Sequence, residues 1–161
     1  RRENLGKPME QMFRAIRRVV EEHSDVKVIY PIHMNPLIHE LASQFFKENN
    51  RIHIINPLEV IDFHNFLNRS YMILTDSGGI QEEAPSLGKP VLVMRDTTER
   101  PEGIKAGTLK LVGTKEESIY TAFNLLLSDN TEYKKMSMAS NPYGDGCASQ
   151  RIADIIERIW Y

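Results

Sequence analysis

The sequence has only one cysteine, Cys147, so the chain has no internal disulfide and no cysteine-rich zinc motif. Its five histidines also lack metal-ligand spacing, and we predict no metal site. No apolar run approaches the roughly 18 residues that a membrane span requires, and the first residues show no signal-peptide pattern. These absences favour a soluble cytoplasmic protein that has no membrane partner.

Clustered positive charge is also missing. The 20 Lys and Arg residues are scattered and are balanced by 22 Asp and Glu residues, so the pattern argues against a nucleic-acid partner. No Gly-x-Gly-x-x-Gly fingerprint follows the first predicted strand, and there is no P-loop. The sequence therefore favours neither NAD nor ATP, and we expect no cofactor.

The residues that are present describe one globular domain over residues 1–161. Apolar residues make up 41% of the chain and charged residues 26%, and this length can bury a substantial core. No repeat or low-complexity segment interrupts it. Because the chain opens at Arg1 without an initiator methionine, we expect it to be a piece of a longer protein.

Hydrophobic periodicity predicts alternating strands and helices. The predicted strands are 26–30, 51–55, 71–74, 90–94 and 108–112. The predicted helices are 8–22, one starting at Pro36, one carrying Val60, Phe63 and Leu67, one following Ser77, and two at 115–128 and 147–160. Strands separated by helix-length segments form βαβ units, so we predict an α/β fold with a Rossmann-like, doubly wound parallel sheet.

The most informative stretch runs from Thr75 to Glu83, between the third strand and the next helix. Ser77 is a good N-cap, Gly78 and Gly79 have no side chain to block an incoming group, and the first-turn amides lack intrahelical partners. This combination predicts a phosphate-binding helix start. Glu83 lies about one and a half turns further along, and its carboxylate can accept hydrogen bonds from sugar hydroxyls.

A capped helix without a ligand is the alternative for this stretch, because short glycine motifs often occur by chance. Ligands of open parallel sheets bind at the carboxyl ends of the strands. The polar segments 31–35, 56–58, 76–79 and 95–103 follow predicted strands, so we expect them to share one rim. Such a site suits a nucleoside diphosphate better than NAD or ATP.

Five motifs, in order, resemble the C-terminal half of the bacterial non-hydrolysing UDP-N-acetylglucosamine 2-epimerases. They are RRENLG at 1–6, YPIHMNP at 30–36, LTDSGGIQEEAP at 74–85, RDTTERPE at 95–102 and NPYGDG at 141–146. The resemblance covers the whole chain and about half of such an enzyme. It implies one half of a GT-B architecture, with two Rossmann-like domains facing a cleft.

The resemblance also implies a function. Family members are isomerases that interconvert UDP-N-acetylglucosamine and UDP-N-acetylmannosamine for cell-envelope polysaccharides, by eliminating and re-adding UDP. By position, Ser77, Gly78 and Gly79 are expected to bind phosphate and Glu83 the ribose. Phe63 is expected near the uracil, and Arg100 on the substrate.

His33 and Arg1 match positions associated with a second, allosteric UDP-sugar. The family's acidic catalytic residues belong to its N-terminal domain, so we expect no catalytic residue in this chain and no activity from the chain alone. The partners implied are UDP, UDP-N-acetylhexosamine, the missing N-terminal domain and, at full length, a second copy in a homodimer.

Alternatives stay open for several of these residues. Phe63 lies on an apolar stripe and can be a core residue, Arg100 can form a surface ion pair, and His33 can be a loop histidine bonded to backbone. His23, His39, His53 and His64 fit ordinary surface or core positions. The whole chain can alternatively be the donor-binding domain of a GT-B glycosyltransferase or a free-standing UDP-sugar-binding module, although the 95–102 and 141–146 motifs favour the epimerase.

Overall fold

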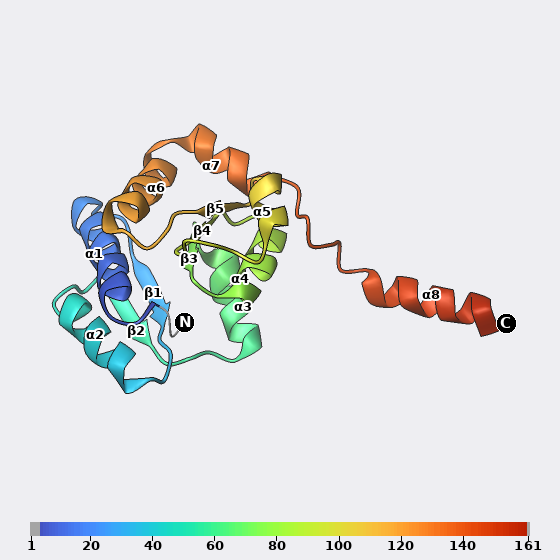
Figure 1. The fold of residues 1–161 in the computed structure, drawn as a ribbon, viewed down its shortest axis with the longest axis horizontal. Helices are drawn as coiled ribbons and strands as arrows, with labels where there is room; N and C mark the ends of the chain where they lie inside the picture. Colours follow the sequence, from blue (N-terminus) through green and yellow to red (C-terminus); the bar gives the residue numbers. More distant parts are fainter. Residues whose placement is uncertain (1–3, 161) are drawn as a thin grey trace.

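The computed structural model describes residues 4–160, so the prediction for Arg1 lies outside the described residues. The strands are β1 (Val28–Pro31), β2 (Ile52–Ile55), β3 (Ile73–Thr75), β4 (Val91–Val93) and β5 (Leu109–Leu111). The helices are α1 (Lys7–Glu22), α2 (Pro36–Phe46), α3 (Val60–Arg69), α4 (Gly78–Glu83), the 3₁₀ helix η2 (Ala84–Leu87), α5 (Pro101–Ala106), α6 (Glu116–Ser128), α7 (Asn130–Ser137) and α8 (Ala148–Trp160). Every paired strand runs parallel to its neighbour, which confirms the predicted α/β class (Figure 1).

Within residues 4–160 the strands form two parallel sheets, whereas the sequence predicted a single one. One sheet has the order β1-β2 and the other β3-β4-β5, and no ladder within residues 4–160 joins β1 to β3. A cavity of about 850 Å³ has β1 and β3 in its lining, together with side chains of α1 and α3. Periodicity identifies strands and their direction, but it carries no signal for which strands are neighbours.

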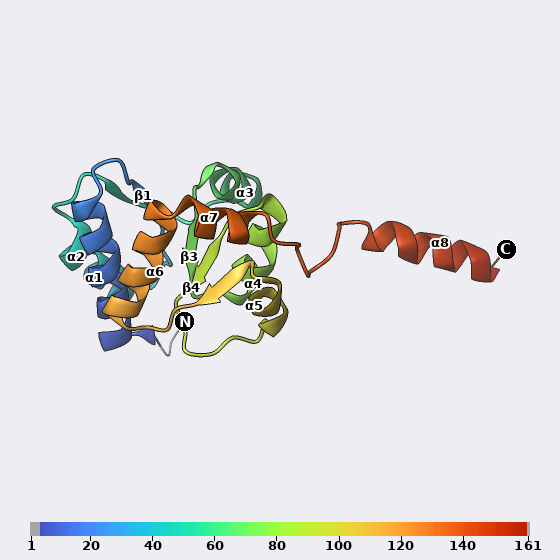
Figure 2. The same cartoon turned by 90° about the horizontal axis from the view of Figure 1, so that it is seen from above.

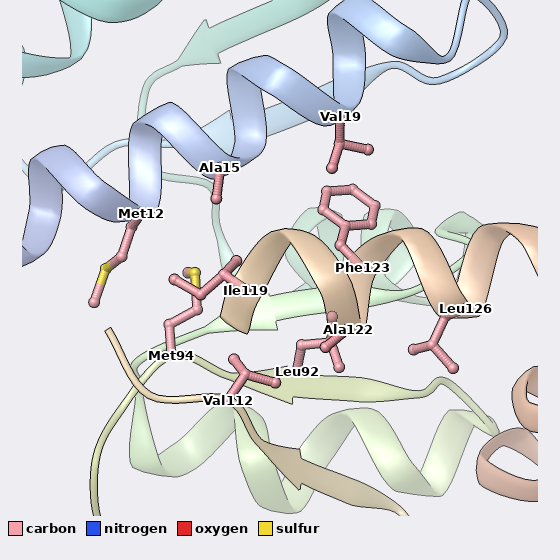
Figure 3. Packing of buried hydrophobic residues seen from close by; sticks show 10 residues of the cluster. All are labelled: Met12, Ala15, Val19, Leu92, Met94, Val112, Ile119, Ala122, Phe123 and Leu126. Carbon is pink, nitrogen blue, oxygen red and sulfur yellow. The ribbon is translucent and has the colours of Figure 1, made fainter. Parts of the chain in front are cut away.

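Both faces of the three-stranded sheet are covered, as a doubly wound arrangement requires. Leu92 and Met94 pack against α1 and α6 (Figure 3). The two residues that alternate with them, Val91 and Val93, pack with Leu67 of α3 and with the start of η2. Because every residue of β4 is buried, this strand reads as a continuous apolar run rather than an alternating one.

A second core lies between the β1-β2 sheet and helices α1 and α2. Phe13 of α1 stands at its centre, with its ring centroid 4.8 Å from that of Phe46 and 5.8 Å from that of Tyr30. Asn35 begins α2 by accepting a hydrogen bond from the Leu37 amide at 3.0 Å, as the predicted Asn-Pro start requires. This core fixes the segment after β1, which carries His33.

Two short helices were not predicted from the sequence. Pro101 lies in the first turn of α5, and Gly107 ends the helix with a φ of 83°, a backbone angle that favours glycine. Asp129 begins α7 by accepting hydrogen bonds from the amides of Thr131 and Glu132 at 2.8 and 3.2 Å. These local end signals identify both helices better than their weak apolar periodicity does.

Helix α8 extends away from the rest of the molecule (Figures 1 and 2). None of its described residues is buried. Its isoleucines at positions 152, 155, 156 and 159 recur at helical spacing and are all exposed, as is Trp160. Among the described residues, no helix is both long enough and apolar enough to cross a membrane.

Candidate functional site

The turn between β3 and α4 has the backbone that the sequence predicts. Ser77 occupies the N-cap position, with φ −82° and ψ 139°, and its amide donates to Oγ1 of the buried Thr75 at 3.0 Å. Within the described residues, the Ser77 hydroxyl makes no capping hydrogen bond to the first turn of α4. The hydroxyl therefore does not compete with an anion for the amides of this helix start.

Glu83 lies closer to this helix start than expected. A Cβ atom added to the exposed Gly79 would lie 3.5 Å from Oε1 of Glu83. The reason is that helical side chains lean toward the N-terminus, so a residue four positions on reaches back over the first turn. The carboxylate is thus a direct neighbour of any group bound above Gly79.

The partner of Glu83 is His64, a residue for which the sequence predicted an ordinary surface or core position and no functional role. Nε2 of His64, on α3, lies 3.1 Å from Oε2 of Glu83. Both side chains are partly exposed. The pairing joins helices that are separated in the sequence, and no local motif signals it.

Arg100 forms an ion pair, as the alternative interpretation allowed, but its partner is neither of its acidic neighbours. Its Nε donates to a carboxylate oxygen of Glu82 on α4, and Nη1 donates to the backbone carbonyl of Glu99 at 3.2 Å. The guanidinium is therefore held beside the helix that begins at Gly78. For Arg100 to contact a ligand, its guanidinium has to leave the Glu82 carboxylate or bond to Glu82 and the ligand at the same time.

A buried glutamine links the same two segments. The side chain of Gln81 has no exposed surface. Its Nε2 donates to the Ser77 carbonyl at 3.0 Å, and its Oε1 accepts from the Thr98 hydroxyl at 2.6 Å. Neither Gln81 nor Thr98 was singled out from the sequence. The signal that could have identified Gln81 is a polar residue on the buried side of a short helix.

Phe63 is half-buried on α3 and packs with the core that includes Leu67 and Ala84. It also lines the cavity between the sheets, together with Ser77. The predicted stripe was wrong for Val60, the first residue of α3, which is 67% exposed, whereas Leu67, seven residues further on the same face, is 5% exposed. Phe63 thus packs against the core and also lines the cavity that Ser77 lines.

His33 lies beyond the carboxyl end of β1 and is exposed. Its Nδ1 accepts a hydrogen bond from the Asn35 amide at 3.2 Å, which is the backbone-bonded arrangement that the alternative described. The second site predicted for His33 and Arg1 is not tested by this contact. Nε2 of His33 belongs to an exposed ring at the end of the β1-β2 sheet.

The carboxyl ends of β1 and β3 lie near each other, as a shared rim requires. Tyr30, Pro31, Asp76 and Ser77 all line the cavity between the sheets. Burial, reinforced by the negative charge of Asp76, raises the pKa of Tyr30 to about 12. Asn4, itself buried, donates from Nδ2 to Oδ2 of Asp76 at 2.9 Å and so ties the start of the described chain to the end of β3.

A family described as UDP-N-acetylglucosamine 2-epimerase matches residues 1–157. The chain belongs to this family. A UDP-N-acetylglucosamine 2-epimerase from Bacillus subtilis (strain 168) is 68% identical over 154 residues, which are 96% of this chain and 40% of the relative.

Solved structures of UDP-N-acetylglucosamine 2-epimerases also match. The S. aureus MnaA–UDP co-structure has a TM-score of 0.94 and 55% identity, covering 99% of this chain and 44% of that one. The UDP-GlcNAc 2-epimerase from Neisseria meningitidis, bound to UDP-GlcNAc, has a TM-score of 0.92 and 41% identity, covering 98% and 43%. The chain thus spans less than half the length of the epimerases it matches.

Proposed function

We propose that this chain is the UDP-binding part of a UDP-N-acetylglucosamine 2-epimerase. The observation that carries the proposal is the start of α4, where Gly78 and the exposed Gly79 offer backbone amides and the carboxylate of Glu83 lies alongside. Within the described residues, the Ser77 hydroxyl makes no capping hydrogen bond and is also available to a ligand. The amides suit a diphosphate and the carboxylate suits the ribose hydroxyls. The epimerase family match favours this function over a glycosyltransferase donor domain or a free-standing module.

Phe63 and Arg100 complete the proposed substrate site. Phe63 offers a half-buried ring that lines the same cavity as Ser77, which suits uracil. Arg100 offers a guanidinium that can move from Glu82 to the diphosphate. His33 and Arg1 are proposed to contribute to a second, allosteric UDP-sugar site.

The proposed reaction divides between this chain and an N-terminal half that precedes it. UDP leaves C1 of the sugar as a proton leaves C2, and UDP then adds back at C1 as a proton returns to the opposite face of C2, which inverts this centre. Amides at the helix start can stabilise the departing diphosphate. They cannot accept the C2 proton, and the base is proposed to belong to the N-terminal half, where the family resemblance puts the acidic catalytic residues.

The exposed apolar face of α8 supports the proposal of a missing half. A helix with this pattern normally buries its apolar side against another element. The chain matches only 40% of the B. subtilis relative, so the unmatched part of such a protein is long enough to cover the apolar face of α8. We further propose that the full-length protein is a cytoplasmic homodimer.

Calorimetric titration of the chain with UDP tests the proposed binding. We expect saturable binding of one UDP per chain. Absence of binding at millimolar UDP, by a chain whose amide exchange shows it to be folded, would contradict the proposal.

A further inference from the structure

A hydrogen-bond relay runs through the interior between α4 and the loop after β4. Gln81 Nε2 donates to the Ser77 carbonyl at 3.0 Å, and the Thr98 hydroxyl donates to Gln81 Oε1 at 2.6 Å. The Arg100 amide then donates to Oγ1 of Thr98 at 3.1 Å. Three hydrogen bonds therefore connect the helix start to the backbone of Arg100.

The burial of Gln81 makes this relay more than a surface contact. Its side chain is fully enclosed, so water cannot replace a lost partner. Each polar end of the carboxamide has a protein partner, and losing one would leave a buried polar group unsatisfied. The carboxamide is thus held in one orientation by the two segments that it joins.

One end of the relay fixes the direction of an amide at the helix start. The Ser77 carbonyl and the Gly78 N–H belong to the same planar peptide unit and point in opposite directions. Because Gln81 holds the carbonyl, it also limits rotation of this unit. The Gly78 N–H is thereby kept pointing out of the helix start, where the proposed phosphate would lie.

The other end fixes the backbone of Arg100. This residue precedes α5 and is its N-cap, and its amide is bonded to the Thr98 hydroxyl. The guanidinium is held separately, by Glu82. A ligand can therefore draw the guanidinium away from Glu82 while the backbone of Arg100 stays anchored through Thr98.

We propose that Gln81 and Thr98 are positioning residues, which set the helix start at Ser77 and the backbone of Arg100 in register for one diphosphate. This inference rests on the proposed UDP site. It adds two residues that do not touch the ligand and act through Gly78 and Arg100.

The first test compares two substitutions at Thr98, which is partly exposed and so tolerates small changes. Thr98→Val keeps the shape and removes the hydroxyl, whereas Thr98→Ser keeps the hydroxyl. NMR titrations with UDP and with uridine separate the diphosphate contribution from the nucleoside contribution. We expect Thr98→Val to weaken UDP binding by about threefold to tenfold, with uridine binding unchanged and Thr98→Ser close to wild type.

A purely structural role for Thr98 would weaken UDP and uridine binding equally. That result, or unchanged UDP binding by Thr98→Val, would overturn the proposal. Loss of binding in Thr98→Ser to the level of Thr98→Val would do the same, because the hydroxyl would then not be the group that matters.

The second test needs no ligand and therefore separates failure of the relay from failure of the proposed function. Gln81→Met retains the length of the side chain but neither hydrogen bond. Gln81 does not itself bond to Arg100, and the relay predicts that the effect of this variant on amide exchange at Arg100 passes through Thr98. We expect exchange at Arg100 to rise by about threefold or more, while amides near Val19 in α1 keep their protection.

Unchanged protection at Arg100 in Gln81→Met, or an unprotected Arg100 amide in the wild-type chain, would overturn the relay even if UDP binds. If UDP does not bind the wild-type chain, the proposed function fails, and the positioning role fails with it.

Discussion

Nε2 of His64 lies 3.1 Å from Oε2 of Glu83, so helix α3 reaches the carboxylate that overhangs the start of α4. The other oxygen of the same carboxylate, Oε1, lies on the side of Gly79. One carboxylate therefore faces a neighbouring helix and a proposed ligand position at once. The contact with His64 restrains the Glu83 carboxylate, and a restrained group loses less conformational freedom when it binds a ligand.

Replacing Glu83 tests its role toward the ribose. We expect Glu83→Ala to weaken UDP binding by about tenfold, because hydrogen bonds to a charged acceptor are lost, and to leave 2′,3′-dideoxy-UDP almost unaffected, since that ligand has no diol. Calorimetry with both ligands measures the difference. Glu116→Ala, on the distant helix α6, serves as the control. Equal losses for the two ligands would mean that Glu83 has a structural role only.

Replacing Gly79 separates stability from binding. Among residues 4–160, apart from its chain neighbours and the backbone of its own helix, a Cβ atom at this position meets Glu83 alone, at an ordinary contact distance of 3.5 Å, so the substituted chain should fold. Gly79→Ala should keep or raise the free energy of unfolding, by up to about 1 kcal/mol, because alanine favours helix. Gly79→Val should weaken UDP binding by about tenfold or more, since its branched side chain fills the space above the amides. A folded Gly79→Val chain with wild-type affinity would rule out a phosphate at this position.

Removing the charge of Glu82 should improve binding. Arg100 is paired with this carboxylate, and a diphosphate has to compete for the guanidinium. Exposed ion pairs are weak, so Glu82→Gln should tighten UDP binding by no more than about fivefold. Calorimetry in low salt measures the change, with Glu132→Gln on α7 as a control. Weaker UDP binding in Glu82→Gln would show that the pair positions Arg100 instead of restraining it.

The sequence predicted the helix start at Ser77 because its signals are local: an apolar strand, a capping residue and two glycines within nine positions. The same holds for the starts of α1 and α2, where proline lies at the first helical positions. The relay from Gln81 to Thr98 spans 17 positions, and the pairing of His64 with Glu83 spans 19. Such contacts depend on how helices pack, which periodicity alone does not specify.

The division into two sheets was missed for a related reason. β1 and β3 each have the apolar pattern of a parallel strand, and that pattern is the same whether or not the two strands are neighbours. The ion pair of Arg100 is another contact that periodicity does not specify. Glu99 and Glu102 are its acidic neighbours in the sequence, but its side chain pairs with Glu82 on α4.

The pKa of Tyr30 predicts a dependence of stability on alkaline pH. Burial, with the charge of Asp76, raises this pKa to about 12 in the folded chain, against about 10 when unfolded. The folded state therefore holds the phenol proton more tightly, and this contribution is complete below pH about 10 and is lost as the pH rises toward 12.

Urea unfolding of wild type and Tyr30→Phe at a pH below this window and at a pH within it measures the effect. Between pH about 9 and about 11, wild type should lose on the order of 1 kcal/mol more unfolding free energy than Tyr30→Phe. Equal losses in both proteins would contradict the burial of the phenol beside Asp76.

Proton NMR of UDP-N-acetylglucosamine in deuterated water tests most directly whether this chain lacks the catalytic base. With the chain alone, we predict that the C2 proton does not exchange and that the anomeric signal of UDP-N-acetylmannosamine does not appear. Both should appear when the N-terminal half is supplied, in the same chain or as a complementing fragment that rebuilds the cleft. Exchange catalysed by this chain alone, at a rate comparable with that of the two-domain protein, would place the base here and contradict the account.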